Sequence, residues 1–290
     1  MGTVGGTAWD DARVWGAMVD WRWVPPSARR FKTDRFDLIV TPGSYSMTTI
    51  YGFLVEDPEK VDAALNEVEG LARSNDATGA RFQILPTSRP LNLGERLVKR
   101  GYAALDEVEV LVYDLRDESG QARLPEFRLP AGISAREVRN DAEYTAFVGL
   151  NAPIWDNPEP PPETRRGLEA EFRKRVADTG HSGRWVVWKE STPIGHGGLE
   201  VVGPVARFWG SGILPGYRNL GAYGALVRAR CELAVQQGAE IALVTARIGT
   251  SGPILKRHGF RVVGPIQNFE VRWSQDQSYA RVPTLRAEGR

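Results

Sequence analysis

Residues 210–224 constrain the fold of this chain more than any other segment. They read Gly-Ser-Gly-Ile-Leu-Pro-Gly-Tyr-Arg-Asn-Leu-Gly-Ala-Tyr-Gly, which predicts a strand end, a tight Pro-Gly turn and a loop leading into a helix. The helix is indicated by an apolar stripe with helical spacing, formed by Ala222, Leu226, Ala229 and Leu233. Because the first turn of a helix has unpaired N–H groups and a partial positive charge, this segment is suited to bind a phosphate or pyrophosphate.

Two residues of the loop strengthen the prediction of an anion site. Gly221 removes a side chain where an anion would approach the backbone, and Arg218 adds a charge that can form paired hydrogen bonds to phosphate oxygens. We therefore expect the backbone amides of residues 219–224, together with Arg218, to hold a phosphate-containing ligand.

Predicted strands and helices follow one another in a regular order around this loop. A short aliphatic strand is predicted at 239–245, and residues 250–260 predict a short helix with a capping hydroxyl, a proline in its first turn and a glycine stop. Further strands are predicted at 184–190, 197–203 and 205–213, a helix after the N-cap residue Asn140, and a last hairpin at about 261–273. The predicted order from 131 to 275 is β-α-α-β-β-β-α-β-α-β.

This order and the spacing Arg218-x-x-Gly221 resemble the acetyl-CoA signature of the GCN5-related N-acetyltransferases (GNAT). Tyr223 departs from the pattern, because the family usually has glycine or alanine there. The resemblance implies acetyl-CoA as co-substrate and direct attack of an amine on its thioester. The acetyl-CoA contacts that it implies are Gly212, Ile213, Leu214, Arg218, Asn219, Leu220, Gly221, Ala222, Tyr223 and Gly224. Backbone N–H groups at Gly212 and Ile213 would hold the charge that develops on the thioester carbonyl.

The two halves of the chain resemble each other. Gly79-Ala80 and Gly238-Ala239 lie 159 residues apart, and Gly101-Tyr102 and Gly259-Phe260 lie 158 apart, each pair in the same predicted helix–strand–helix setting. A shared order of elements without duplication would give a similar offset. We predict an α+β fold of two tandem acetyltransferase-like domains, each a mixed, mostly antiparallel twisted sheet flanked by helices.

The predicted domain boundary falls in the segment between residues 116 and 132, which has two prolines and mixed charge. Residues 1–120 would form a degenerate copy without a phosphate loop, and residues 131–290 would form the acetyl-CoA-binding domain. We expect the first half to help wall the acceptor site.

The groups that move protons are less clear from the sequence. Many members of the family have a tyrosine four residues before the Gly-Phe pair, as a general acid for the leaving thiolate, and Leu255 occupies that position here. His196 and Glu200 lie four apart in a predicted strand and so share one face, which makes them candidate catalytic residues. A histidine base predicts a kcat/KM that rises through roughly pH 6 to 7. The alternative is a strand histidine with a satisfied hydrogen bond and a solvated edge charge.

Two other aromatic residues have open roles. Tyr223 would either close over the pantetheine arm or pack against a neighbouring strand. Trp155 and Asp156 would either hold an amine by ring face and charge or belong to a structural proline-rich connector.

Composition excludes several classes of function. A net charge of +1 gives no basic surface for nucleic acid, and the longest apolar runs are well below the roughly 18 residues of a membrane span. The only cysteine, Cys231, cannot form an internal disulfide, and three histidines without short ligand spacing do not predict a metal site. We therefore expect a cytoplasmic protein that uses no metal and binds neither nucleic acid nor membrane.

The leading hypothesis is an N-acyltransferase that transfers an acetyl or other acyl group from acyl-CoA to a small amine. One alternative is a catalytically weak acyl-CoA-binding or regulatory module, which Leu255 favours. A second is a transferase that uses aminoacyl-tRNA, against which the near-neutral charge and the Arg218-x-x-Gly221 loop argue. The acceptor, the acyl chain and the oligomeric state are not encoded in a readable motif, because acceptor pockets are built from variable loops.

Overall fold

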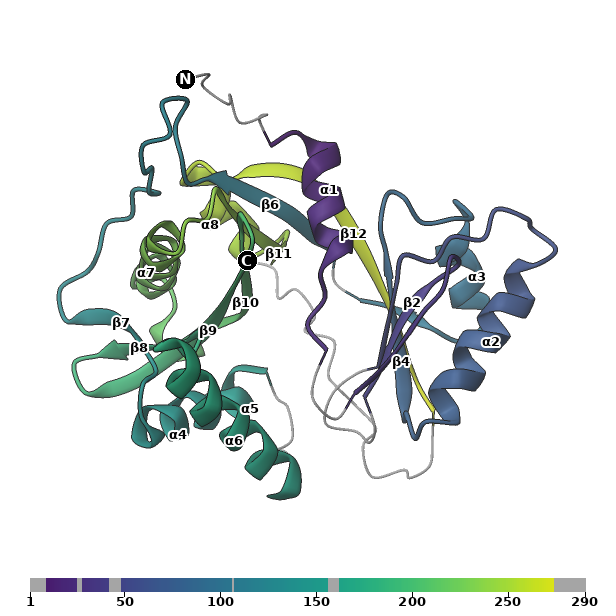
Figure 1. Cartoon of the computed structure of the whole chain (residues 1–290), viewed down its shortest axis with the longest axis horizontal. Helices are drawn as coiled ribbons and strands as arrows, with labels where there is room; N and C mark the ends of the chain where they lie inside the picture. The colour runs from purple at the N-terminus through teal and green to yellow at the C-terminus, as the bar shows by residue number, and fades with distance from the viewer. Residues whose placement is uncertain (1–8, 25–27, 42–47, 106, 156–161, 274–290) are drawn as a thin grey trace.

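The computed structural model describes residues 9–24, 28–41, 48–105, 107–155 and 162–273 (Figure 1). The helices are α1 (Asp11–Asp20), α2 (Val61–Arg73), α3 (Leu93–Lys99), α4 (Asp141–Gly149), α5 (Asn151–Trp155), α6 (Pro162–Thr179), α7 (Ala222–Gln236) and α8 (Ser251–Arg257), with a 3-10 turn at Pro215–Tyr217. The strands are β1 (Arg29–Lys32), β2 (Asp37–Val40), β3 (Thr48–Tyr51), β4 (Gly79–Ile84), β5 (Ala103–Ala104), β6 (Val108–Asp114), β7 (Ile133–Glu137), β8 (Arg184–Lys189), β9 (Thr192–Val202), β10 (Val205–Ile213), β11 (Ile241–Arg247) and β12 (Arg261–Arg272).

One mixed sheet runs through both halves of the chain. Its order is β1-β2-β3-β4-β12-β6-β11-β10-β9-β8-β7, and β5 pairs with β12. Most neighbours are antiparallel, and the described strands form only two parallel pairs, β3 with β4 and β10 with β11. Each parallel pair encloses a helix, α2 in the first half and α7 in the second. This recurrence of one β-α-β unit confirms the predicted tandem fold.

The two halves exchange strands in the sheet. Strand β6 belongs to the first half but lies between β11 and β12, with Asp114 opposite Ile241 and Val112 opposite Arg261. Strand β12 pairs at its far end with β4, where Phe269 lies opposite Phe82. Figure 1 shows β12, in yellow, running from one lobe into the other.

The hairpin expected at residues 261–273 is therefore wrong. The segment is a single strand, and its irregularity is a register shift between Val262 and Gly264 rather than a turn. The neighbouring strand that a hairpin would have supplied comes from β6 of the first half.

Helices cover both faces of the second half of the sheet. Side chains of α7 and α8 form one core with Phe208 and Val244, whereas α1 packs on the neighbouring residues Val205 and Leu243. Because alternate residues of a strand point to opposite faces, α1 lies on the face opposite α7 and α8. Helices α4 and α6 pack with Val186 in a separate cluster.

Local sequence signals explain where several helices begin. The predicted N-cap Asn140 accepts a hydrogen bond from the amide of Glu143, and the carboxylate of Glu143 accepts one from the amide of Arg139. Helix α2 buries Val61 and Leu65, four positions apart on one face, against β4 and β12. Over the described ranges, none of the helices combines the length and apolar character needed to cross a membrane.

Candidate functional site

Strands β10 and β11 are paired over only the first part of their length. They pair in parallel from Val205 opposite Ile241 to Phe208 opposite Val244, and no further pairs follow. Beyond that point β10 stays with β9 through a register shift between Trp209 and Gly212, while β11 stays with β6. The two strands thus separate at an opening between residues 209–213 of β10 and 245–247 of β11. The backbone groups of β10 that face this opening have no partner among the described strands. Gly212 lies at the irregularity of β10.

The predicted phosphate loop connects the end of β10 to α7. Asn219 and Gly221 both have positive φ angles, of 63° and 79°. Gly221 is the N-cap of α7 and provides no side-chain cap, so the first amides of the helix are left for another partner. Residues 218–221 are exposed, whereas Ala222 and Gly224 are buried under them. This arrangement keeps the loop accessible to an anion.

Arg218 and the end of β10 are tied together. The Nε of Arg218 donates to the carbonyl of Ile213 at 3.2 Å, and the amide of Leu214 donates to the carbonyl of Ile194 at 2.9 Å. The guanidinium of Arg218 is therefore held near the loop in which it was predicted to bind phosphate. The loop residue Leu220 is 42% exposed and makes no contribution to the core.

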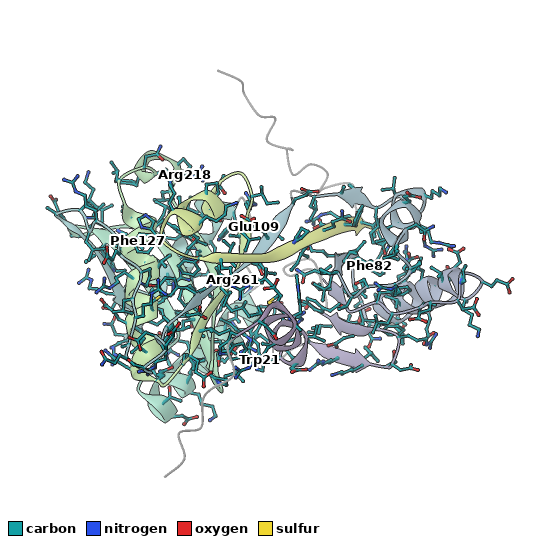
Figure 2. The ribbon with its side chains drawn as sticks, turned by 90° about the horizontal axis from the view of Figure 1, so that it is seen from above. Trp21, Phe82, Glu109, Phe127, Arg218 and Arg261 are labelled. Carbon is teal, nitrogen blue, oxygen red and sulfur yellow. The ribbon has the colours of Figure 1, made fainter. Side chains whose placement is uncertain are left out.

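The segment between β6 and β7 covers part of the loop, which the sequence did not predict. A Cβ atom at Gly221 would lie 3.2 Å from Cδ of Pro130, and one at Gly224 would lie 2.6 Å from the ring of Phe127. Phe127 also stacks on His258 of the α8 C-cap, with ring centroids 4.0 Å apart, and Figure 2 shows it on the same lobe as Arg218. A side chain at Gly221 would therefore meet Pro130, which is a second reason for glycine at this position; the role of Gly221 in anion binding stays a prediction.

Tyr223 joins α7 to α8. Its hydroxyl is hydrogen bonded to Ser251, the first residue of α8, and its ring packs against the core under both helices. Because α7 follows the end of β10 and α8 follows the end of β11, this bond joins the two helices that come after the separated strands. Burial raises the pKa of Tyr223, so the phenol stays protonated at neutral pH.

His196 is enclosed on β9, opposite Gly212. It is only 2% exposed, and its Nε2 accepts a hydrogen bond from the indole of Trp155 at 3.0 Å. The ring is therefore neutral, with its proton on Nδ1. Burial, with a smaller contribution from the charge of Arg230, lowers the pKa of His196 to about 4. The rise in kcat/KM between pH 6 and 7 that a histidine base predicted is not expected from this group.

Glu200 has a different partner and a different place. Its Oε2 lies 2.5 Å from Nη1 of Arg175 on α6, and the residue is opposite Arg207 in the β9–β10 ladder. The structure thus puts His196 at the strand irregularity and Glu200 in an ion pair farther along β9. Asp156, the other predicted polar contact, lies outside the described residues.

The sequence reasoning missed Arg230, which is fully buried on α7. Its Nη1 donates to the carbonyl of Gly198 at 3.0 Å and to Oγ of Ser211 at 2.8 Å, so it fastens the helix to the irregular part of β10. Burial lowers its pKa to about 10, which leaves it charged at pH 7. The available signal was its position four residues after Leu226, on the face predicted to be buried.

The remaining predicted features have structural roles. Cys231 is buried, and burial raises the pKa of its thiol to about 12, which removes the thiolate needed by a nucleophile.

In the first half, the segment between β3 and α2 has Glu56, Asp57 and Glu59 where the second half has its glycine loop. Acidic side chains at that place repel phosphate.

The buried His196 makes a pH-dependent contribution to stability. The folded pKa is about 4 and the ordinary value is 6.5, so between these values the unfolded chain binds a proton that the folded chain excludes. We expect the free energy of unfolding to rise with pH across this window, by on the order of 1 kcal/mol per pH unit from this group. Urea unfolding from pH 4.5 to 7.5 measures the slope. His196→Gln should flatten it, and an unchanged slope in that variant would contradict the assignment.

A tandem sheet with a splayed parallel β-α-β unit and a glycine loop at the start of its helix defines the acetyltransferase class of fold. The model described as "Acetyltransferase (GNAT) family" matches residues 147–251, from α4 to the first residue of α8. Residues 147–251 are therefore similar to the GNAT acetyltransferases, within a tandem arrangement of the fold.

Solved structures share the fold over most of the chain. A GCN5-related N-acetyltransferase from Sphaerobacter thermophilus is 15% identical, with a TM-score of 0.60 over 89% of this chain and 85% of that one. One from Kribbella flavida is 17% identical, with a TM-score of 0.59 over 84% and 89%. A tandem GNAT protein from the clavulanic acid biosynthesis pathway is 15% identical, with a TM-score of 0.52 over 92% and 88%. The search of curated proteins gave no match.

Proposed function

We propose that the protein transfers an acetyl group from acetyl-CoA to the amine of a small acceptor. The observation that carries the proposal is the exposed loop of residues 218–221 beside the opening between β10 and β11. The uncapped amides of α7 and the charge of Arg218 suit the pyrophosphate. The unpaired backbone groups of β10 suit the pantetheine arm and the thioester carbonyl, with Gly212 and Ile213 at the reacting end.

The reaction requires two proton movements. The amine nitrogen forms a bond to the acetyl carbon and loses a proton, while the carbon–sulfur bond breaks and the CoA thiolate gains one. We propose Tyr223 as the donor to the thiolate, because its hydroxyl is protonated at neutral pH and is hydrogen bonded to Ser251, between the two helices that follow β10 and β11. It would supply from α7 the phenol that Leu255 does not supply from α8.

The roles that we propose for His196 and Glu200 are more limited than the catalytic roles that the sequence suggested. Since the Nε2 lone pair of His196 is used by Trp155, we propose that His196 positions the indole beside the opening. A role of this kind predicts that His196→Gln raises KM for the acceptor and leaves the shape of the pH profile unchanged. Glu200, paired with Arg175, is proposed to accept the amine proton only through water.

Removing the Tyr223 hydroxyl provides a direct check of the proton donor. We expect Tyr223→Phe to lower kcat by about 100-fold, because general acid help is of that order, and to leave the Kd for acetyl-CoA within about threefold. Tyr217→Phe, in the same loop, is the matched control and should change neither constant. Equal kcat values for the two variants would remove Tyr223 from the mechanism.

The function itself is tested by titration calorimetry with acetyl-CoA, followed by thiol release across a panel of small amines. We expect one acetyl-CoA per chain, since the first half has an acidic segment in place of the glycine loop. Binding without turnover on any amine would favour the acyl-CoA-binding or regulatory module. Two acetyl-CoA molecules per chain would contradict the assignment of the first half, and no binding would overturn the proposal.

A further inference from the structure

A small hollow lies on the α1 face of the sheet, where β10 and β11 part. It measures about 140 Å³, and its walls include Phe208 and Val244, the last pair of residues that joins the two strands. The phosphate loop belongs to α7, which covers the opposite face. A ligand in the hollow and an acyl group in the opening would thus approach the same point from opposite sides of the sheet.

The other walls of the hollow come from the end of α1 and the segment that follows it. Met18, Trp21, Arg22 and Trp23 line it from the first half of the chain, and Arg207 and Thr245 line it from the sheet. Trp21 is labelled in Figure 2, at the junction of the two lobes. The first half of the chain thus supplies part of the walls of this hollow, as we expected of an acceptor site.

Arg22 brings a positive charge to this hollow. Among the described residues, its Nε and Nη2 atoms are buried and have no hydrogen-bond partner, and only Nη1 donates, to the carbonyl of Trp21 at 3.4 Å. The guanidinium lies 4.5 Å from the ring centroid of Tyr51, an attraction that compensates part of the cost of burial but leaves the charge in place.

Arg207 brings a second charge. It donates to the carbonyls of Ala17 at 2.9 Å and Val205 at 3.4 Å, and its guanidinium lies 5.1 Å from the ring of Trp21. Within the described ranges, neither Arg22 nor Arg207 has a carboxylate within 4.0 Å. Burial lowers the pKa of Arg207, and the nearby charge of Arg22 lowers it further. The two cations therefore repel each other across the hollow.

Asp37 acts through its charge on Arg22. Asp20 and Glu200 act in the same way on Arg207. Asp20 is exposed at the end of α1 and forms no ion pair with either arginine, and the other two carboxylates are engaged elsewhere. Asp37 forms two hydrogen bonds to Arg30, at 2.8 and 2.6 Å, and Glu200 is paired with Arg175. Two half-buried cations that share a concave site without an ion-paired carboxylate leave a positive potential that an anionic ligand would neutralise. A guanidinium with free N–H groups matches the two oxygens of a carboxylate or a phosphate.

We infer that this hollow binds an oxyanion group, a carboxylate or a phosphate, of the acceptor amine through Arg22 and Arg207. The inference rests on the proposed acetyl transfer for the identity of the ligand as an acceptor, and the hollow's geometry alone supports the anion site. Trp21 and Met18 would contact the apolar part of the same molecule. The hollow has about the volume of a cavity that holds one benzene molecule, so the part of the ligand inside it must be small.

The test compares acceptors that differ in one charge. Thiol release from acetyl-CoA is measured with an ω-amino acid, its primary amide, the amine without the acid group, and the corresponding aminoalkyl phosphate. We expect kcat/KM to be about 10- to 100-fold higher for whichever of the acid and the phosphate fits than for the amide, as charge-assisted hydrogen bonds predict. Equal values for the acid, the phosphate and the amide would overturn the inference.

Variants of the two arginines provide the second arm. Arg22→Gln and Arg207→Gln should each lower kcat/KM for the anionic acceptor by about 10- to 100-fold, change that for the neutral amide by less than about threefold, and leave acetyl-CoA affinity unchanged. Arg73→Gln is the matched control, because Arg73 also lies over a tryptophan, Trp273, with its guanidinium 4.1 Å from the ring. Equal losses on charged and neutral acceptors would overturn the inference.

A binding measurement separates this inference from the proposed function. Quenching of tryptophan fluorescence by the acid and the phosphate is followed without acetyl-CoA, in the natural chain and in Arg207→Gln. Saturable quenching that is lost in the variant supports the anion site even if no amine is acetylated, in which case acetyl transfer fails alone. Acetylation of amines without such binding, or binding unchanged in Arg207→Gln, overturns the anion site and leaves acetyl transfer standing.

Discussion

A chain that carries Arg218→Ala together with Gly221→Asp is expected to bind acetyl-CoA at least about 100-fold more weakly than the natural chain. The arginine change removes the charge that is anchored beside the loop by its bond to Ile213. The aspartate adds a negative charge at the N-cap of α7, where it would compete with phosphate for the first amides of the helix. Titration calorimetry gives the affinity.

Charge must be separated from strain in this experiment. Gly221 has a φ of 79° and lies close to Pro130, so any side chain there is strained. Gly221→Ala introduces that strain without the charge and should weaken binding much less than Gly221→Asp. Gly120→Asp is the matched control, because Gly120 has the same φ and open space around it. Wild-type affinity in the double variant would remove the basis of the acetyl-CoA site.

Residues 131–290 are expected not to fold when produced alone. The described strand partners of β12 are β4, β5 and β6, all from the first half, and β11 would lose β6 from one edge. Phe269 of β12 would also lose its place in the core of the first half, against Phe82. Circular dichroism and urea unfolding should show no cooperative transition for this piece.

Cutting the chain without removing strands is the control. A chain nicked after residue 120 keeps every strand of the sheet, so the two pieces should stay associated and unfold together. The predicted domain boundary at residues 120–131 would then be a connection that can be cut, and the two halves on either side of it would not be stable independently. Cooperative unfolding of residues 131–290 alone, with acetyl-CoA binding retained, would contradict the importance that we give to the exchanged strands.

The sequence alone was sufficient for the β-α-β unit that holds the loop. Its signals are local: a strand, a Pro-Gly turn, Arg218, Gly221 and an apolar stripe lie within about 25 residues, and helix capping and periodicity act over that range. The offset of the two Gly-Ala pairs likewise led to the tandem fold, since duplicated elements keep their order whatever they pack against. The closeness of Pro130 to Gly221 could not be predicted, because Pro130 lies about 90 positions earlier in the chain.

Other features depended on contacts that no local pattern encodes. The neutral state of His196 follows from Trp155 on a different element, and the partner of β12 comes from the other half of the chain.

What the sequence by itself determined is the elements of the β-α-β unit, their order and the loop for which anion binding is predicted, because backbone propensity and hydrophobic periodicity act between neighbours. Only the tertiary structure decided which strands the halves exchange and that Arg22 and Arg207 face one hollow. Arg207 reaches the carbonyl of Ala17, 190 positions away in the chain. Such pairings are set by the packing of the whole sheet, where burial and unpaired charge depend on residues that the sequence separates.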